Sequence, residues 1–154
     1  MSSALSTAAI RDAVHSAASA SGMFNAVLDH EPVTEPGNGL TAAITADRIS
    51  PAPAASGLAA TSVLLLLGAR IYTPLHSEPR DATDITLSDA VDALLASYIG
   101  GFTLGALVRD VDVNGEFGTP LEAVYGYVDF NGALYRVATI TIPVVNNDVW
   151  SQNA

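Results

Sequence analysis

The chain has 154 residues, which is enough for a single domain (1–154) built around one hydrophobic core. Its formal net charge is −10, with six Lys plus Arg against 16 Asp plus Glu, so it lacks the basic residues with which nucleic-acid-binding proteins neutralise phosphates. It has no cysteine, which excludes disulfides and thiolate metal sites.

The N-terminal half predicts one helix followed by strands. The helix spans about 3–21, because apolar and small side chains recur there at helical spacing, with Leu5, Ile10 and Val14 on one side. Strands are predicted at 23–28, 40–49 and 58–72, separated by a Pro- and Gly-rich loop at 30–39 and a small-residue linker at 50–57.

The run 58–72 is the longest apolar stretch of the chain. Its centre is unbroken by polar residues, which is typical of a strand buried on both faces, so we expect it in the middle of the sheet. After a charged loop at 74–84, the sequence Thr86-Leu-Ser-Asp89 matches a capping box and predicts the start of a second helix. Its apolar stripe is Leu87, Val91, Leu94, Leu95 and Tyr98, and Gly100-Gly101 is its expected end.

The C-terminal part predicts a short strand at 107–113, a turn at 114–120 and a β-hairpin at 121–145. Asn131-Gly132 tolerates the positive φ angles of a two-residue turn, which pairs Phe130 with Ala133 and Val128 with Tyr135. A further turn is expected at 146–148. One hairpin face then carries Val124, Val128, Phe130, Tyr135 and Val137, and the other carries Ala123, Tyr125, Tyr127, Arg136, Ala138, Ile140 and Ile142.

This order of elements predicts an α+β fold, a mostly antiparallel sheet with a C-terminal β-hairpin, packed by two α-helices. Neither hairpin face is plainly polar, so we expect both to meet protein, either helices of the chain or another subunit. The low charged fraction, 14%, also favours a surface covered in an assembly, the alternative being a neutral exterior rich in small residues.

The sharpest chemical motif is Asp110-x-Asp112-x-Asn114-Gly115, which matches the first half of an EF-hand calcium loop. Leu121 stands where the closing Glu is required, and Glu122 is one residue late. The flanks also predict strands and not helices. We therefore expect a strand edge running into a turn, with no metal and no cofactor.

Catalysis has little support in the sequence. His15, His30 and His76 are scattered over a helix and two loops, and no Gly-x-Ser-x-Gly elbow or phosphate-binding glycine loop is present. The most apolar run, 58–69, is shorter than the ~20 residues needed to span a bilayer, and the N-terminus lacks the pattern of a signal peptide. We expect a soluble intracellular protein that is not an enzyme and does not associate with a membrane.

Several segments together resemble a small tail-assembly protein of long-tailed phages infecting actinobacteria, namely the tail terminator of the head–tail junction. They are His30-Glu-Pro32 near Gly39-Leu-Thr-Ala-Ala-Ile44, Ser56-Gly-Leu-Ala-Ala-Thr-Ser62, Arg70-Ile-Tyr-Thr-Pro74, Tyr135-Arg136 with Ile140-Thr-Ile-Pro143, and Asn147-Asp-Val-Trp150. The motifs form a layout and carry no catalytic signature.

The resemblance implies a homohexameric ring, located in the virion and in the host cytoplasm during assembly. Such a ring caps the tail tube, ends its polymerisation and joins it to the head connector protein. Six copies would carry 6 × −10 = −60 charges, so genomic DNA would pass without specific binding.

The expected contacts with neighbouring subunits are the loops 31–39 and 50–57 and the hairpin. The residues to test there are Tyr125, Tyr127, Arg136, Ile140 and Trp150. Four alternatives remain: another head-completion or connector protein, a tail tube subunit, a calcium-binding module and a small hydrolase.

Overall fold

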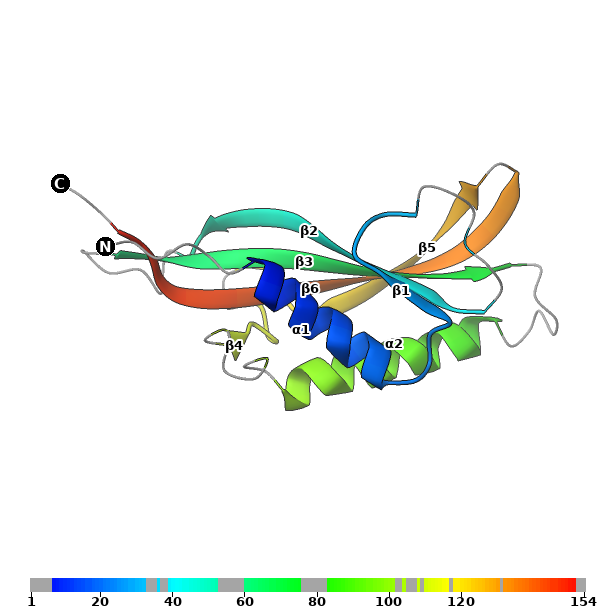
Figure 1. The fold of residues 1–154 in the computed structure, drawn as a ribbon, viewed down its shortest axis with the longest axis horizontal. Helices are drawn as coiled ribbons and strands as arrows, with labels where there is room; N and C mark the ends of the chain where they lie inside the picture. Colours follow the sequence, from blue (N-terminus) through cyan, green and yellow to red (C-terminus); the bar gives the residue numbers. More distant parts are fainter. Residues whose placement is uncertain are drawn as a thin grey trace.

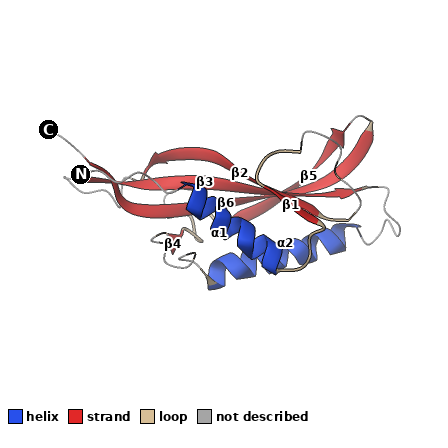
Figure 2. Cartoon of the chain, viewed as in Figure 1, coloured by secondary structure: helices blue, strands red, loops and turns tan. Residues whose placement is uncertain are grey.

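The protein is described here from a computed structural model covering residues 7–32, 36, 39–52, 60–75, 83–101, 104, 108, 110–116, 118–130 and 132–151, without the side chains of 60 and 147–151. It has the α+β fold that the sequence predicts: a curled, mostly antiparallel six-stranded sheet carries both helices on one face (Figure 1; Figure 2). The elements are α1 (Thr7–Ala20), β1 (Ala26–Leu28), β2 (Thr41–Pro51), β3 (Ala60–Pro74), α2 (Thr83–Gly100), β4 (Asp110–Val111), β5 (Glu122–Phe130) and β6 (Ala133–Ser151).

Helix α1 covers the sheet with side chains spaced four residues apart. Ile10, Val14 and Ala18 are fully buried, and this spacing places them above one another on one side of a helix. Gly22 follows at φ +71°, a left-handed conformation that ends a helix and that glycine adopts without steric cost. The predicted helix is thus confirmed over the described residues, while Leu5 lies outside them.

Helix α2 confirms the predicted apolar stripe but begins at Thr83, three residues before the predicted cap. The capping box at Thr86 is wrong, because Thr86 lies inside the first turns of the helix. Asp84 occupies the first turn, where a carboxylate is stabilised by the helix dipole. The residues buried on α2 are Thr83, Leu87, Ala90, Val91, Leu94 and Tyr98.

Strand β3 lies in the middle of the sheet, between β2 and β6, as the unbroken apolar run predicts. Alternate side chains of β3 point to opposite faces of the sheet, and buried residues occur on both faces. On the helix side they join one large core cluster. The β3 members of that cluster are Leu65, Leu67, Ala69 and Ile71, which meet the stripes of α1 and α2.

Strand β6 runs through the turn predicted at 146–148, so that prediction is wrong. It pairs with β3 from Pro74↔Tyr135 to Ala60↔Ser151. Val63 pairs with Asn146 and Thr61 with Trp150, so β6 has two more residues than β3 over this stretch. A β-bulge absorbs the extra residues and lets the ladder continue, whereas a turn would have left the end of β3 without its β6 partner.

Three other boundaries differ from the predicted ones. Strand β1 pairs over three residues only, in parallel with the start of β2. The predicted linker is wrong at its start, because Ser50 and Pro51 belong to β2 and pair with Leu64 and Val63; the segment 53–59 lies outside the described residues. Strand β4 pairs over Asp110–Val111, and two positions of the longer predicted strand, 107 and 109, lie outside the described residues.

Candidate subunit-contact surface

The β5–β6 hairpin has the register that the Asn-Gly turn predicts. Phe130 pairs with Ala133, Val128 with Tyr135, and the ladder continues without a register shift to Glu122↔Thr141. The hairpin projects at one end of the sheet (Figure 1). Gly132 has φ +89°, as a residue in a type I′ turn requires, while Asn131 lies outside the described residues.

Three of the predicted contact residues form one cluster, called the tyrosine–arginine cluster: Tyr125, Tyr127 and Arg136. The Arg136 guanidinium carbon lies 4.4 Å from the Tyr127 ring centroid and 5.5 Å from that of Tyr125, within the range of cation–π attraction. Arg136 Nε also donates to Asp84 Oδ1 at 2.9 Å, and Nη1 donates to the Gly126 carbonyl at 3.2 Å. The hydroxyls of Tyr125 and Ser88 are 2.9 Å apart, which ties the cluster to α2.

The cluster is ordered by its own contacts and still faces solvent. The side chain of Arg136 is only 15% exposed to solvent, whereas Tyr127 is 62% exposed and Tyr125 is 38% exposed. On the other face of β5, Val124 is 61% exposed. Exposed Tyr beside an Arg held in a fixed orientation is the residue chemistry that interfaces favour.

The outer edge of β5 is also open. Within the described residues β5 pairs with β6 alone, so the backbone N–H and C=O groups of its opposite edge have no strand partner there. Just before β5, the Leu121 N–H on this side donates to the Val113 carbonyl. Strand β5 contains no proline, lysine or bulge, the usual devices that prevent such an edge from pairing. Both its side chains and its backbone are therefore available to another protein.

The remaining two predicted contact residues lie elsewhere. Ile140 is fully buried in the core cluster on the helix side, between Ala69 of β3 and Ala123 of β5. It therefore has no exposed surface that a neighbouring subunit could contact. Trp150 lies in β6 opposite Thr61, and its side chain is outside the described part of the chain.

Two described positions after β1, Glu31 and Pro36, contact the helix-free face of the sheet. Glu31 accepts hydrogen bonds there from the Tyr72 hydroxyl and from Arg70 Nη1, both at 2.8 Å. The Tyr135 hydroxyl donates to the Pro36 carbonyl. Within the predicted contact loop 31–39, these two described positions therefore contact the chain's own sheet.

An aromatic cluster lies on the same face of the sheet. Phe130 meets Tyr72 and Tyr135 edge to face, with ring centroids 5.5 and 5.3 Å apart. Burial of Tyr72 and its hydrogen bond to Glu31 raise the pKa of the Tyr72 hydroxyl to about 12. No local pattern in the sequence predicts this arrangement, because Glu31 and Tyr72 are 41 residues apart.

This raised pKa predicts a loss of stability in alkali. Since the pKa of Tyr72 is higher in the folded than in the unfolded chain, its contribution is fully present below about pH 10 and is lost as the pH rises through about 12. The free energy of unfolding should therefore fall more steeply over this interval in the native chain than in Tyr72→Phe. Tyr127→Phe is the control for removal of a phenol, and equal slopes for the native chain and Tyr72→Phe would contradict the assignment.

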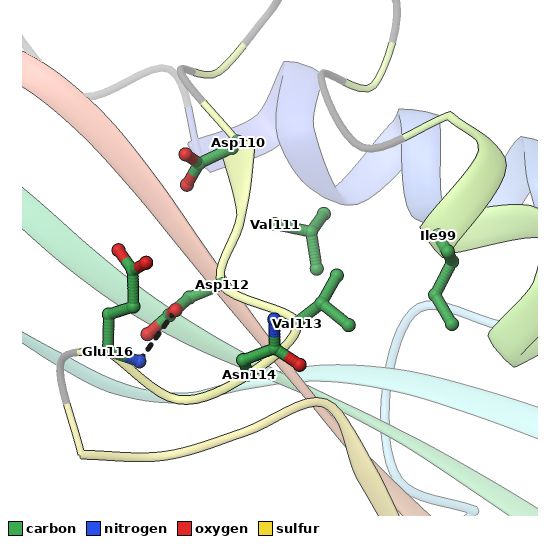
Figure 3. A pocket seen from close by; sticks show the side chains of 7 residues that line it. All are labelled: Ile99, Asp110, Val111, Asp112, Val113, Asn114 and Glu116. Atoms are coloured by element: carbon green, nitrogen blue, oxygen red, sulfur yellow. Dashed lines mark hydrogen bonds between the residues drawn. The ribbon is translucent and has the colours of Figure 1, made fainter.

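The half-EF-hand motif lines a pocket of about 340 Å³ beside the end of α2 (Figure 3). Asp110, Asp112, Asn114 and Glu116 lie around it with Ile99. Asp112 is 5% exposed, and its Oδ1 accepts a hydrogen bond from the Glu116 backbone N–H at 2.8 Å. This hydrogen bond closes the turn that follows β4. Among the described residues, no three His, Asp or Glu side chains converge on a common metal position.

The two described histidines make different hydrogen bonds. His15 Nδ1 lies 2.7 Å from Asp29 Oδ1, between α1 and the end of β1, and His30 Nδ1 lies 2.8 Å from the Glu31 carbonyl. His76 is outside the described residues. Neither described histidine lines the pocket around Asp112.

Comparison with known proteins adds no relative to this description. No protein-family model matches the chain, and no curated protein matches it. No helix in the described ranges combines the length and hydropathy needed to cross a membrane.

Proposed function

We propose that this protein is a structural virion subunit of the tail-terminator type. Copies of it form a ring that caps the tail tube and joins it to the head connector, and the sequence resemblance implies six copies in that ring. The observation that carries the proposal is made on the hairpin. Its tyrosine–arginine cluster is held in place by contacts within the chain, is exposed, and lies beside an open strand edge. Such a surface serves binding to protein better than catalysis.

Two further observations support a ring. The described sheet has two unlike edges: the regular edge of β5 on one side and, on the other, the part of β2 beyond β1, where the register shift between Ala46 and Arg48 favours contact through side chains over strand pairing. Contacts between two different surfaces of identical subunits generate rings when the rotation closes. The net charge of −10 on each copy suits a channel through which DNA slides without being held.

The proposal is tested by mixing the purified chain with tail tubes that lack a terminator. Negative-stain microscopy should show a ring at one end of the tubes, and light scattering should give the number of copies in any free ring. Tyr127→Ala combined with Arg136→Ala should reduce tube capping, whereas Ile99→Ala, which removes an exposed apolar side chain at the far end of α2, serves as the control. A chain that never binds tube ends contradicts the proposal, and long tubes formed by the chain alone would identify a tube subunit instead.

A further inference from the structure

The central five residues of the open strand β5 read the same in both directions. Its sequence Glu122-Ala-Val-Tyr-Gly-Tyr-Val-Asp-Phe130 contains the palindrome Val-Tyr-Gly-Tyr-Val, with Gly126 in the middle. An antiparallel pair of identical strands related by a two-fold axis places residues at equal distances from the centre opposite one another. The palindrome therefore places like side chains opposite each other across such an axis.

The backbone N–H and C=O groups of β5 also point in the directions that this pairing requires. In a hairpin closed by two residues, the flanking pair Phe130–Ala133 is hydrogen-bonded, and every second pair along the ladder follows it. The N–H and C=O groups of the intervening residues point away from β6. The N–H of Leu121 agrees with this phase, because it donates outward to the Val113 carbonyl at 3.2 Å. The outward-facing residues of β5 are Ala123, Tyr125, Tyr127 and Asp129.

We propose that two free copies of this protein pair through β5 in antiparallel orientation about Gly126. All four outward-facing residues of each strand then form hydrogen-bonded pairs, Tyr125 with Tyr127 of the second copy and Ala123 with its Asp129. On the other face, Val124 lies opposite Val128 of the second copy, which covers a side chain that is 61% exposed in one copy. Glu122 and Asp129 never lie opposite a carboxylate.

A second copy fits this edge better than the other edge of the sheet does. Strand β2 has a register shift between Ala46 and Arg48, with Asp47 between them, and bulges and charges of this kind discourage pairing. Asp47 also lies over β3, since a Cβ on Gly68 would approach its Oδ2 to 2.4 Å. Only the β5 edge within the described sheet combines a long regular strand with a self-complementary sequence.

The pairing is inferred from the sequence and backbone register of β5, while its consequence for assembly rests on the proposed function. The pair covers the same hairpin surface that a ring would use, so it would keep free subunits from polymerising until they meet a tube end. Each copy carries −10 charges, and salt screens their repulsion. The pair should therefore tighten as the ionic strength rises.

Cysteine cross-linking tests the register directly, because the chain has no cysteine of its own. Gly126 and its symmetry mate form a non-hydrogen-bonded pair, with Cα atoms about 4.5 Å apart, within the range of a disulfide. A Cβ at Gly126 meets only Val137 Cγ1, at 3.8 Å, so Gly126→Cys fits the fold. Under diamide, Gly126→Cys should become a covalent dimer nearly completely.

Val124→Cys is the matched control, on the same face and more exposed. Its symmetry mate lies four residues along the strand, about 13 Å away, so Val124→Cys alone should stay monomeric on denaturing gels. Mixed with Val128→Cys, it should give the heterodimer. Equal self-cross-linking of Gly126→Cys and Val124→Cys, or none by Gly126→Cys, overturns the proposal.

Light scattering provides a second measurement. The native chain should have twice its 15.8 kDa mass, and Tyr127→Pro, which removes an outward N–H, should have the single mass. If Tyr127→Pro fails to fold, judged by circular dichroism, the cross-linking decides alone. Tube capping is scored separately. If the chain caps tubes but Gly126→Cys does not cross-link, only the pairing is refuted. If Gly126→Cys cross-links but the chain does not cap tubes, only the terminator function is refuted.

Discussion

Ile140→Ala is expected to lower the free energy of unfolding by about 2–5 kcal/mol, the range for truncating a fully buried aliphatic side chain. Ile140 is 0% exposed, and its direct cross-strand neighbours are Ala69 and Ala123. These small side chains cannot fill the space that its truncation leaves. Urea denaturation of dilute protein, with the slope against denaturant unchanged, measures the effect.

The control for this substitution is Val124→Ala on the neighbouring strand. Val124 is 61% exposed, so its truncation should change the free energy of unfolding by no more than about 0.5 kcal/mol. If Ile140→Ala leaves stability intact and instead weakens association, Ile140 acts at a subunit contact as the sequence suggested, and the description of it as a core residue fails.

Gly115→Ala is expected to cost about 1–3 kcal/mol of stability, because alanine must adopt a left-handed conformation there. Gly115 has φ +73°, and a Cβ on it would lie 2.9 Å from the Pro120 backbone nitrogen, which cannot move as a flexible side chain can. Thermal and urea denaturation measure the loss. Gly100→Ala is the control, since nothing lies within 4 Å of its added Cβ, and it should be neutral or slightly stabilising.

This prediction also separates two explanations of the motif at 110–115. In a calcium loop, the glycine serves the metal, and calcium should raise the melting temperature of the native chain. In the described turn, the glycine serves the backbone between β4 and β5. We expect the loss in Gly115→Ala to be the same with calcium and with a chelator, and a calcium-dependent difference would revive the metal site.

The hairpin could be predicted because its signals are local. Asn-Gly fixes a two-residue turn, and the register follows by counting outward from it, as the pairs Phe130↔Ala133 and Val128↔Tyr135 confirm. The alternation of side chains then placed Tyr125, Tyr127 and Arg136 on one face, where the structure joins them. Whether this surface contacts other subunits stays a prediction.

The errors in the prediction arose where local signals competed with long-range pairing. Asn146-Asn147-Asp148 has the composition of a turn, yet the ladder with β3 continues past it, because broken backbone hydrogen bonds cost more than a bulge. Thr86 has the pattern of a helix cap, but the helix begins earlier, where Asp84 reaches Arg136 on β6. A partner 52 residues away cannot be found from local spacing.

The sequence alone determined the α+β class, the central position of the 58–72 run, the apolar stripe of the second helix and the hairpin register. Each depends on periodicity or turn chemistry within about 20 residues. Only the tertiary structure decided that Ile140 is buried, that Glu31 holds Tyr72, and that the edge of β5 is open. Burial and edge exposure depend on which distant elements cover a residue, and in this chain both helices pack on the same face of the sheet.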